Sequence, residues 1–369
     1  MEDTLYNQIA ETLRGKIRGG ELNPGGRLPS EAELSRQFGV SRITSKRALS
    51  ELEREDLIYR KKGSGSYVRP EKPCEATVGG QIAMVVPIGT PRAGLMDIIS
   101  GAVDALFENG YGLSVHSSMR DSLAERKLLE SLWGGPVCGV ICYPVSDNDN
   151  LDLISAMSAN RFPFVAVDRQ YEGLPIASAA SDDFDGGRRL TRYLLDLDHR
   201  NIAFFATRAL GDASSVRQRY FGYAAALGEA GVRYRGVMLR RELGGAEYSN
   251  CDEKIRHGFQ NVVSELLCDG ATAVIAQSDH HAVNLIAACD DLGVEVPGRL
   301  SVAGFDNLPM SAHITPPLTT VGQDFTGIGR SAAGLVLELL GGSDPRKIVL
   351  PVELIARGSC VKPRGVKTV

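Results

Sequence analysis

The spacing of apolar residues changes near residue 81 and divides the chain into two regions. In the first, apolar side chains recur every four residues at Leu5, Ile9, Leu13 and Ile17, which predicts an amphipathic helix. In the second, short runs of consecutive apolar residues alternate with longer amphipathic stretches. Such runs are typical of strands buried in a parallel sheet, and the amphipathic stretches are typical of the helices that cover it.

The second region therefore predicts an α/β fold of parallel sheets flanked by helices. The expected strands cover residues 82–86, 113–116, 137–142, 164–167, 202–205, 237–239, 273–276 and 300–303. The expected helices cover residues 95–109, 123–133, 149–160, 184–197, 215–230, 252–268 and 281–292. About 290 residues are too many for one comfortable sheet. We therefore expect two lobes, with a cleft at the carboxyl ends of their strands.

The first region also carries the signals of two short helices joined by a tight turn. Ser30 followed three residues later by Glu33 is a capping box, which predicts a helix start. Gly39 can end that helix, and Ser41 can cap the next one. The expected arrangement is helix, turn, helix.

The second of these helices has a cationic face and an apolar face. Arg42 and Lys46 lie four residues apart and therefore share a face, while Leu49 and Leu52 supply the apolar side. Residues 57–68 then read L-I-Y-R-K-K-G-S-G-S-Y-V, a basic hairpin with a glycine-rich tip. A helix pair followed by such a hairpin is a winged helix-turn-helix, which binds duplex DNA. A solvated helix or a flexible turn explains either feature alone, but their order and spacing together favour DNA binding.

Charge and composition along the chain agree with a separate DNA-binding end. Residues 1–70 hold 13 Lys or Arg against 10 Asp or Glu, whereas the remaining residues hold 28 against 35. This small positive excess indicates a local basic stripe and not a basic domain. Two prolines, charges and a glycine pair without periodicity predict a linker at residues 70–80. The expected domains are residues 1–69, for DNA binding, and residues 81–366, for ligand binding and dimerisation.

The first region resembles the GntR family of bacterial regulators. The shared motifs are P-S-E-A-E-L, V-S-R-I-T-S-K-R-A-L-S-E-L and G-S-G-S-Y-V, and the resemblance covers about residues 4–69. It implies that the DNA-binding residues are Ser30, Ser41, Arg42, Thr44, Lys46, Arg47, Gly63, Ser64 and Gly65. Lys46 stands where the family usually has arginine, so a bidentate fork is replaced by a point charge.

The second region resembles the LacI-family effector domain, which is similar to periplasmic sugar-binding proteins. The motifs include Val165–Arg169, Ser181–Gly187, Arg219–Tyr223, Gly304–Asn307 and Pro317–Gln323, and the resemblance spans about residues 81–360. It implies that the effector-binding residues are Leu95, Asp168, Arg219, Tyr248, Ser278, Asp279, Asp306, Gln323 and Phe325.

The residue types in this set suit a polyol. Sugar hydroxyls donate to carboxylates and accept from arginine, and the C–H faces of a sugar stack on aromatic rings. A GntR-type head on a LacI-type body resembles the arabinose-repressor group, so a pentose such as L-arabinose is the leading candidate. A nucleobase or an amino acid remains the alternative. We expect Asp182 and Asp183 to cap a helix, and His280 and His281 to have a structural role.

An enzyme fused to a winged helix is the competing class of protein. An aminotransferase-like domain needs a lysine for pyridoxal phosphate, and Lys254, in a polar helical stretch, is the only lysine between residues 128 and 346. Neither a Walker A spacing nor a G-x-S-x-G motif occurs. Cys138 and Cys142 have no matching Cys or His cluster after them. We therefore expect no enzymatic activity, no cofactor and no metal.

The expected partners are operator DNA, a sugar and a second copy of the chain. The first residues lack a cationic segment followed by an apolar run, and no apolar stretch reaches about 18 residues. The odd number of cysteines, seven, is typical of reduced thiols. We accordingly expect a cytoplasmic homodimer that does not contact a membrane.

Overall fold

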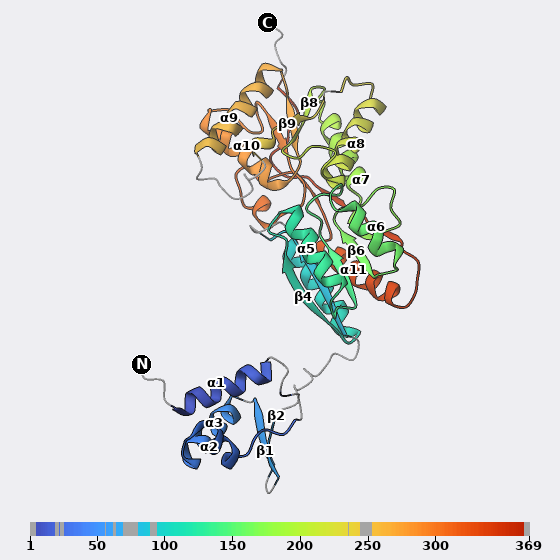
Figure 1. Ribbon diagram of the computed structural model, residues 1–369. Coiled ribbons are helices and arrows are strands. Elements are labelled where there is room, and N and C mark those ends of the chain that lie inside the picture. The colour runs from blue at the N-terminus through green and yellow to red at the C-terminus, as the bar shows by residue number, and fades with distance from the viewer. Residues whose placement is uncertain are drawn as a thin grey trace. The chain divides into compact units, whose positions relative to one another are not determined.

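The computed structural model describes residues 5–18, 22, 26–55, 57–61, 64–68, 80–88, 94–234, 236–243 and 253–364. The chain divides into two compact units, Met1–Ala76 and Thr77–Val369 (Figure 1). Of the predicted linker at residues 70–80, only Gly80 is among the described residues. None of the helices in these described ranges is long and apolar enough to cross a membrane.

The described residues of the first unit form three helices and a hairpin. The helices are α1 (Leu5–Arg18), α2 (Glu31–Phe38) and α3 (Arg42–Arg54), and the strands are β1 (Ile58–Lys61) and β2 (Gly65–Val68). Their shared core consists of Ile9, Ala10, Leu13, Leu28, Leu34, Ala48, Leu49, Leu52, Ile58 and Val68. The predicted apolar faces of the helices therefore meet in one small core.

The two strands pair antiparallel, with Ile58 opposite Val68 and Lys61 opposite Gly65. The rings of Tyr59 and Tyr67 stack across the pair at 5.7 Å between centroids. Gly65 has φ +123°, a conformation that other residues rarely adopt, which explains a glycine at this end of the hairpin. The predicted winged helix-turn-helix is thus present.

The second unit has two lobes, each with its own parallel sheet. The first-lobe sheet has the strand order β13-β7-β6-β5-β3-β4. Its strands are β3 (Gly80–Val86), β4 (Tyr111–Ser117), β5 (Gly139–Cys142), β6 (Phe164–Val167), β7 (Ala177–Ser181) and β13 (Lys347–Leu350). Helices α4 (Leu95–Glu108) and α11 (Phe325–Leu340) cover one face, and α5 (Ser122–Trp133) and α6 (Leu151–Ala159) cover the other.

The second-lobe sheet has the order β11-β10-β8-β9. Its strands are β8 (Ile202–Ala206), β9 (Met238–Leu239), β10 (Ala273–Ala276) and β11 (Ser301–Ala303). Helices α7 (Asp183–Asp196) and α8 (Ser214–Glu229) pack on one face, and α9 (Glu253–Cys268) and α10 (Asp279–Asp291) on the other. Short elements complete this lobe: η1 (Arg241–Leu243), η3 (Pro309–Ala312), and the antiparallel pair β12 (Thr320–Gly322) and β14 (Glu353–Ile355).

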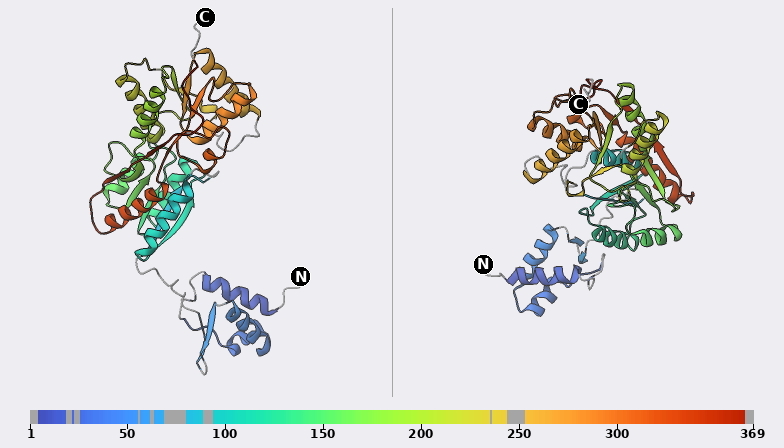
Figure 2. Two further views of the ribbon diagram at one scale, coloured as in Figure 1. Left: turned by 180° about the vertical axis from the view of Figure 1, so that it is seen from behind. Right: turned by 90° about the horizontal axis from the view of Figure 1, so that it is seen from above.

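One helix and four strands among the described residues were not predicted from the sequence. Helix α11 contains several glycines, which weaken a helix signal, but the structure uses one of them for packing. A side chain at Gly329 would overlap the Ile98 carbonyl oxygen, and one at Gly101 would overlap that of Thr326. Helices α4 and α11 therefore lie almost backbone to backbone, side by side in Figure 2.

The missed strands are β7, β12, β13 and β14. The sequence of β7, A-S-A-A-S, has none of the branched or aromatic residues that mark strands, although every one of its residues is buried. The other three are short and owe their pairing to segments far away in the chain. Within the described residues the chain passes between the lobes at three places: β7 to α7, β12 to α11, and β13 to β14.

Candidate functional site

The predicted caps hold the helix-turn-helix in shape. The Ser30 hydroxyl accepts a hydrogen bond from the Glu33 amide, and the Glu33 carboxylate accepts one from the Ser30 amide at 2.7 Å. Gly39 ends α2 with φ 64°, and Ser41 accepts from the Thr44 amide at 3.1 Å. The predicted capping box, glycine end and second cap are all confirmed.

The start of α3 presents a cationic surface with an apolar centre. Arg42 and Lys46 are both exposed, whereas Leu49 and Leu52, further along the helix, are buried. Ile43, which the sequence analysis did not single out, is 80% exposed. An exposed branched side chain between two cations suits contact with a thymine methyl group in the major groove.

Two other arginines tie this surface to its surroundings. The guanidinium of Arg47, a predicted DNA contact, lies 4.3 Å from the Tyr6 ring centroid and so faces α1. Arg60 of β1 donates to the Lys46 carbonyl at 3.3 Å and to the Ser50 hydroxyl at 2.9 Å. The hairpin is thereby bonded to α3. Of the other predicted contacts, Gly63 lies outside the described residues.

A pocket at the carboxyl ends of the strands of both lobes gathers most of the predicted effector residues. Its lining comprises Tyr143, Asp168, Arg169, Arg208, Ala213, Ser215, Val216, Arg219, Gln277, Ser278, His280, Asp306, Gln323 and Phe325. About 590 Å³ of empty space, which includes open solvent, lies between these residues. The lining is mostly polar, with the aromatic rings of Tyr143 and Phe325 added.

Arg219 is the centre of the polar network in this pocket. Its Nε donates to Asp183 Oδ1 at 2.7 Å, its Nη1 donates to the Gln277 carbonyl at 2.6 Å, and its guanidinium lies over the Phe305 ring. Asp306 Oδ1 lies 3.4 Å from Arg219 Nη1 and accepts from Gln323 Nε2 at 2.7 Å. The second lobe and the crossing from β12 to α11 thus supply this network.

Close packing of α7 against α8 places Arg219 in the pocket wall. A side chain at Gly187 of α7 would overlap the carbonyl oxygen of Arg219, and one at Gly222 of α8 would overlap that of Phe184. The two backbones therefore approach closely, and Asp183 at the start of α7 comes beside Arg219.

Backbone conformation at the strand ends is also unusual. Asp168 has φ 64°, Asp306 has φ 113° and Asn307 has φ 52°. Residues other than glycine adopt such angles at a cost, and they concentrate at functional sites. Here the turns aim two carboxylates into the pocket.

Comparison with known proteins identifies the two parts of the chain. A model of the bacterial regulatory proteins of the gntR family matches residues 5–68, and a model of a periplasmic binding protein-like domain matches residues 191–360. The chain joins a GntR-type domain to a periplasmic-binding-protein-like domain.

Relatives that match most of the chain are named as transcriptional repressors. The arabinose metabolism transcriptional repressor of Geobacillus stearothermophilus is 29% identical over 97% of this chain and 98% of its own length. The repressor PurR of Photobacterium profundum is 27% identical over 87% of this chain and 90% of its own. The chain is accordingly a DNA-binding transcriptional regulator.

Solved structures share the fold. A LacI-family regulator from Enterococcus faecium with bound ribose has a TM-score of 0.62 and 24% identity, covering 77% of this chain and 100% of its own. A complex of the regulator CelR with cellobiose has a TM-score of 0.65 and 23% identity, covering 90% of this chain and 100% of its own. Both show the fold of the periplasmic-binding-protein-like domain.

Two predicted effector residues, Asp279 and Leu95, are not among the pocket-lining side chains of this domain. Asp279 is fully buried and accepts from the Leu308 amide at 2.8 Å and from the Thr320 hydroxyl at 2.5 Å. Leu95 packs in the core of the first lobe. Tyr248 lies outside the described residues. The carboxylate of Asp279 therefore braces the loop that carries Asp306, which the motif alone could not distinguish from ligand contact.

The expectations for two neighbouring pairs were each half right. Asp182 does cap α7, accepting from the Asp185 amide at 2.9 Å, but Asp183 pairs with Arg219 instead. His281 is buried and bonds the Ser278 hydroxyl at 2.7 Å, as a structural histidine would, whereas His280 lines the pocket.

The pocket also contains residues that were not predicted from the sequence, including Tyr143, Arg169, Arg208 and Ser215. Tyr143, Arg169 and Arg208 lie within two residues of the ends of β5, β6 and β8, and Ser215 lies in the first turn of α8. The rule that ligands bind at the carboxyl ends of strands would have indicated the first three positions.

Burial dominates the ionisation of the acids around Arg219. It raises the pKa of Asp183 to about 7, with the positive charge of Arg219 opposing the shift. It raises the pKa of Asp306 well above the ordinary value, again against Arg219. Burial lowers the pKa of Arg219, but the carboxylates of Asp183, Asp306 and Asp168 raise it by more, so the guanidinium stays charged.

The raised pKa of Asp183 predicts a loss of stability as pH rises. Between the ordinary value of 3.8 and about 7, the folded protein holds a proton that the unfolded chain releases. Each pH unit in this window therefore lowers the free energy of unfolding by up to about 1.4 kcal/mol. Asp183→Asn removes this contribution, so the Tm of the variant relative to wild type should rise between pH 5 and pH 8 in thermal denaturation. A relative Tm that is constant or falls would contradict it.

Proposed function

We propose that this regulator is a repressor that binds its operator through the start of α3 and releases it when a sugar binds between the lobes. The observation that carries the proposal is the arrangement of Arg219, Asp306 and Gln323. At the pocket wall the Asp306 carboxyl group lies within hydrogen-bonding reach of both the Arg219 guanidinium and the Gln323 amide. Vicinal hydroxyls of a sugar match such alternating donors and acceptors.

The relatives support this ligand class. The Geobacillus relative is named for arabinose metabolism, and the Enterococcus and CelR structures contain ribose and cellobiose. The pocket adds the rings of Tyr143 and Phe325, on which the C–H face of a sugar can stack. A pentose such as L-arabinose is our leading candidate. We propose that the chain acts by binding alone and catalyses no reaction.

We also propose that the repressor is a homodimer joined through its ligand-binding unit. On α4 the side chains of Met96, Val103 and Phe107 are exposed, at a spacing that places them on one face. Strand β4 is at the edge of its sheet and exposes Val115. Contact between two such apolar faces would set two α3 helices about one duplex turn, or ~34 Å, apart or a multiple of it, as a pseudo-palindromic operator requires.

Operator release then follows from a shift between open and closed lobes. A ligand that prefers the closed pocket displaces the equilibrium by its difference in affinity for the two states. A coupling of about 1–3 kcal/mol would weaken operator binding some 5- to 150-fold. Tighter operator binding on adding the sugar would contradict this sign.

A thermal-shift screen tests the ligand class directly. Pentoses, hexoses, disaccharides, sugar phosphates, nucleobases and amino acids are added at millimolar concentration. A ligand present at 1,000 times its Kd stabilises the folded protein by about 4 kcal/mol, so one pentose should give a large rise in Tm. A response to nucleobases or amino acids alone would overturn the sugar and leave the DNA-binding assignment in place.

A further inference from the structure

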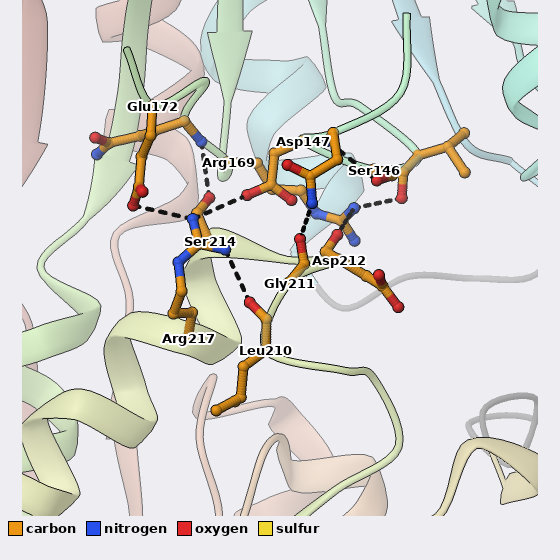
Figure 3. Close-up of polar contacts among 12 residues, drawn as sticks. Ser146, Asp147, Arg169, Glu172, Leu210, Gly211, Asp212, Ser214 and Arg217 are labelled. Carbon is orange, nitrogen blue, oxygen red and sulfur yellow. Dashed lines mark hydrogen bonds and ion pairs between the residues drawn. The ribbon is translucent and has the colours of Figure 1, made fainter. Parts of the chain in front are cut away.

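Polar contacts join the two lobes beside the pocket (Figure 3). The first lobe contributes the segments 145–148 and 169–172, which follow β5 and β6. The second lobe contributes the segment 210–217, which leads from β8 into α8. We call the ionic part of this contact, formed by Asp147, Glu172 and Arg217, the latch.

Arg217 makes both ionic contacts of the latch. Its Nη2 lies 2.9 Å from Glu172 Oε1 and 3.4 Å from Asp147 Oδ2, both in the other lobe. Its Nη1 donates to the Leu210 carbonyl at 2.8 Å, which fixes the guanidinium within its own lobe (Figure 3). The Arg217 side chain is 16% exposed and that of Asp147 only 2%, so water screens the second pair weakly.

Further hydrogen bonds extend the contact between the lobes toward the pocket. The side-chain amide of Asn148 donates to the Gly211 carbonyl, and the backbone amide of Gln170 donates to the Ser214 hydroxyl at 2.9 Å. Arg169 donates to the Val145 carbonyl of its own lobe and reaches the Asp212 carbonyl of the other at 3.5 Å. Arg169 is 3% exposed and lines the pocket, so the pocket wall and the contact between lobes share a residue.

None of the three latch residues is among the pocket-lining side chains. We propose that the latch is a second closing element, which stabilises the closed lobes without touching the effector and thereby sets effector affinity. This inference rests on the proposed function for the ligand, but the closing role itself follows from the contacts. Arg217, Asp147 and Glu172 are thus positioning residues and not binding residues.

The latch stabilises mainly the closed form. When the lobes separate, Asp147 regains water, whereas in the closed form a buried Asp147 without Arg217 would be an uncompensated charge. Removing the guanidinium therefore lowers the fraction of molecules that are closed. The apparent Kd equals the intrinsic Kd divided by that fraction, so affinity falls although every pocket contact is kept.

The test compares Arg217→Gln, Glu172→Gln and the double variant with Arg346→Gln. Arg346 forms a bidentate pair with Glu338 at 2.7 and 2.8 Å inside the first lobe, so its loss removes an ion pair of the same kind without affecting the lobe contact. Hydrogen–deuterium exchange without sugar reports on opening, and calorimetric titration with L-arabinose reports on affinity. Tm values show that each variant is folded.

We expect faster exchange in segments 145–148, 169–172 and 210–217 of Arg217→Gln, and about ten-fold weaker L-arabinose binding. Glu172→Gln should cause a smaller loss that is not additive with Arg217→Gln, because both remove the same pair. High salt should shrink the difference between Glu172→Gln and wild type, because the Glu172 side chain is exposed, a response that loss of packing would not give. Arg217→Lys should restore part of the affinity.

Unchanged exchange and affinity in Arg217→Gln, or an equal loss in Arg346→Gln, would overturn the latch. Faster exchange in Arg217→Gln combined with no L-arabinose binding by the wild-type protein would overturn the pentose and keep the closing role. The two failures are therefore distinguishable.

Discussion

Arg42→Ala should abolish specific operator binding while sugar affinity stays unchanged. Arg42 is exposed at the first turn of α3, where a recognition helix meets base edges. A bidentate contact to guanine contributes about 1–3 kcal/mol of discrimination, and a dimer makes it in both half-sites. We therefore expect a loss of about 2–6 kcal/mol, measured by fluorescence anisotropy on an operator obtained by in vitro selection.

Arg54→Ala is the matched control for this variant. Arg54 lies at the other end of α3, where it forms an ion pair with Glu51 and its side chain is largely exposed. Its removal should leave specific binding within about two-fold, because it lies away from the start of the recognition helix. An equal loss in Arg54→Ala would indicate non-specific electrostatics, and simultaneous loss of sugar binding in Arg42→Ala would indicate misfolding.

Asp306→Asn should have the opposite effect, with operator binding kept and the response to sugar lost. Asparagine tolerates the left-handed backbone at this position better than alanine would, so the fold of the turn is preserved. The change replaces an acceptor that Gln323 and Arg219 share with a group of different hydrogen-bonding capacity. Hydrogen bonds to charged groups contribute about 1.5–3 kcal/mol each. Loss of two such bonds to the sugar should therefore weaken sugar binding by about 10² or more.

Calorimetry and a release assay on bound operator measure these two outcomes. Asp182→Asn is the control, because Asp182 caps α7 and asparagine caps helices equally well. Wild-type sugar affinity in Asp306→Asn would remove Asp306 from the binding site. Loss of operator binding in the same variant would show that the change damages the fold instead.

Local structure could be predicted where its cause lies within a few residues. The capping box of Ser30, the left-handed Gly39 and the cap at Ser41 each depend on bonds spanning three to five positions. The buried strands β3, β5, β6 and β10 are recognisable because a strand covered on both faces is apolar throughout. The LacI resemblance implied that Arg219 and Asp306 both bind the effector, and the structure brings them within 3.4 Å.

Other features depend on contacts between distant segments. The small residues of β7 and the glycines of α11 lower the signal that a strand or helix normally gives, yet β7 is fully buried and Gly329 approaches the backbone of α4. Asp183 and Asp279 follow the same pattern as pocket acids, yet one pairs with Arg219 and the other braces a loop. Only the fold of the whole unit distinguishes these partners.

The sequence by itself determined a winged helix-turn-helix, an α/β body of two lobes and the residue types suited to a polyol. These follow from periodicity, capping and turn chemistry, which are properties of neighbouring positions. The tertiary structure alone decided which acids face the pocket, that Arg169 joins its wall, and that Arg217 bridges to Asp147 and Glu172 across 70 and 45 positions. Such pairings are set by how the lobes pack, and no local pattern encodes the distance between two strand ends.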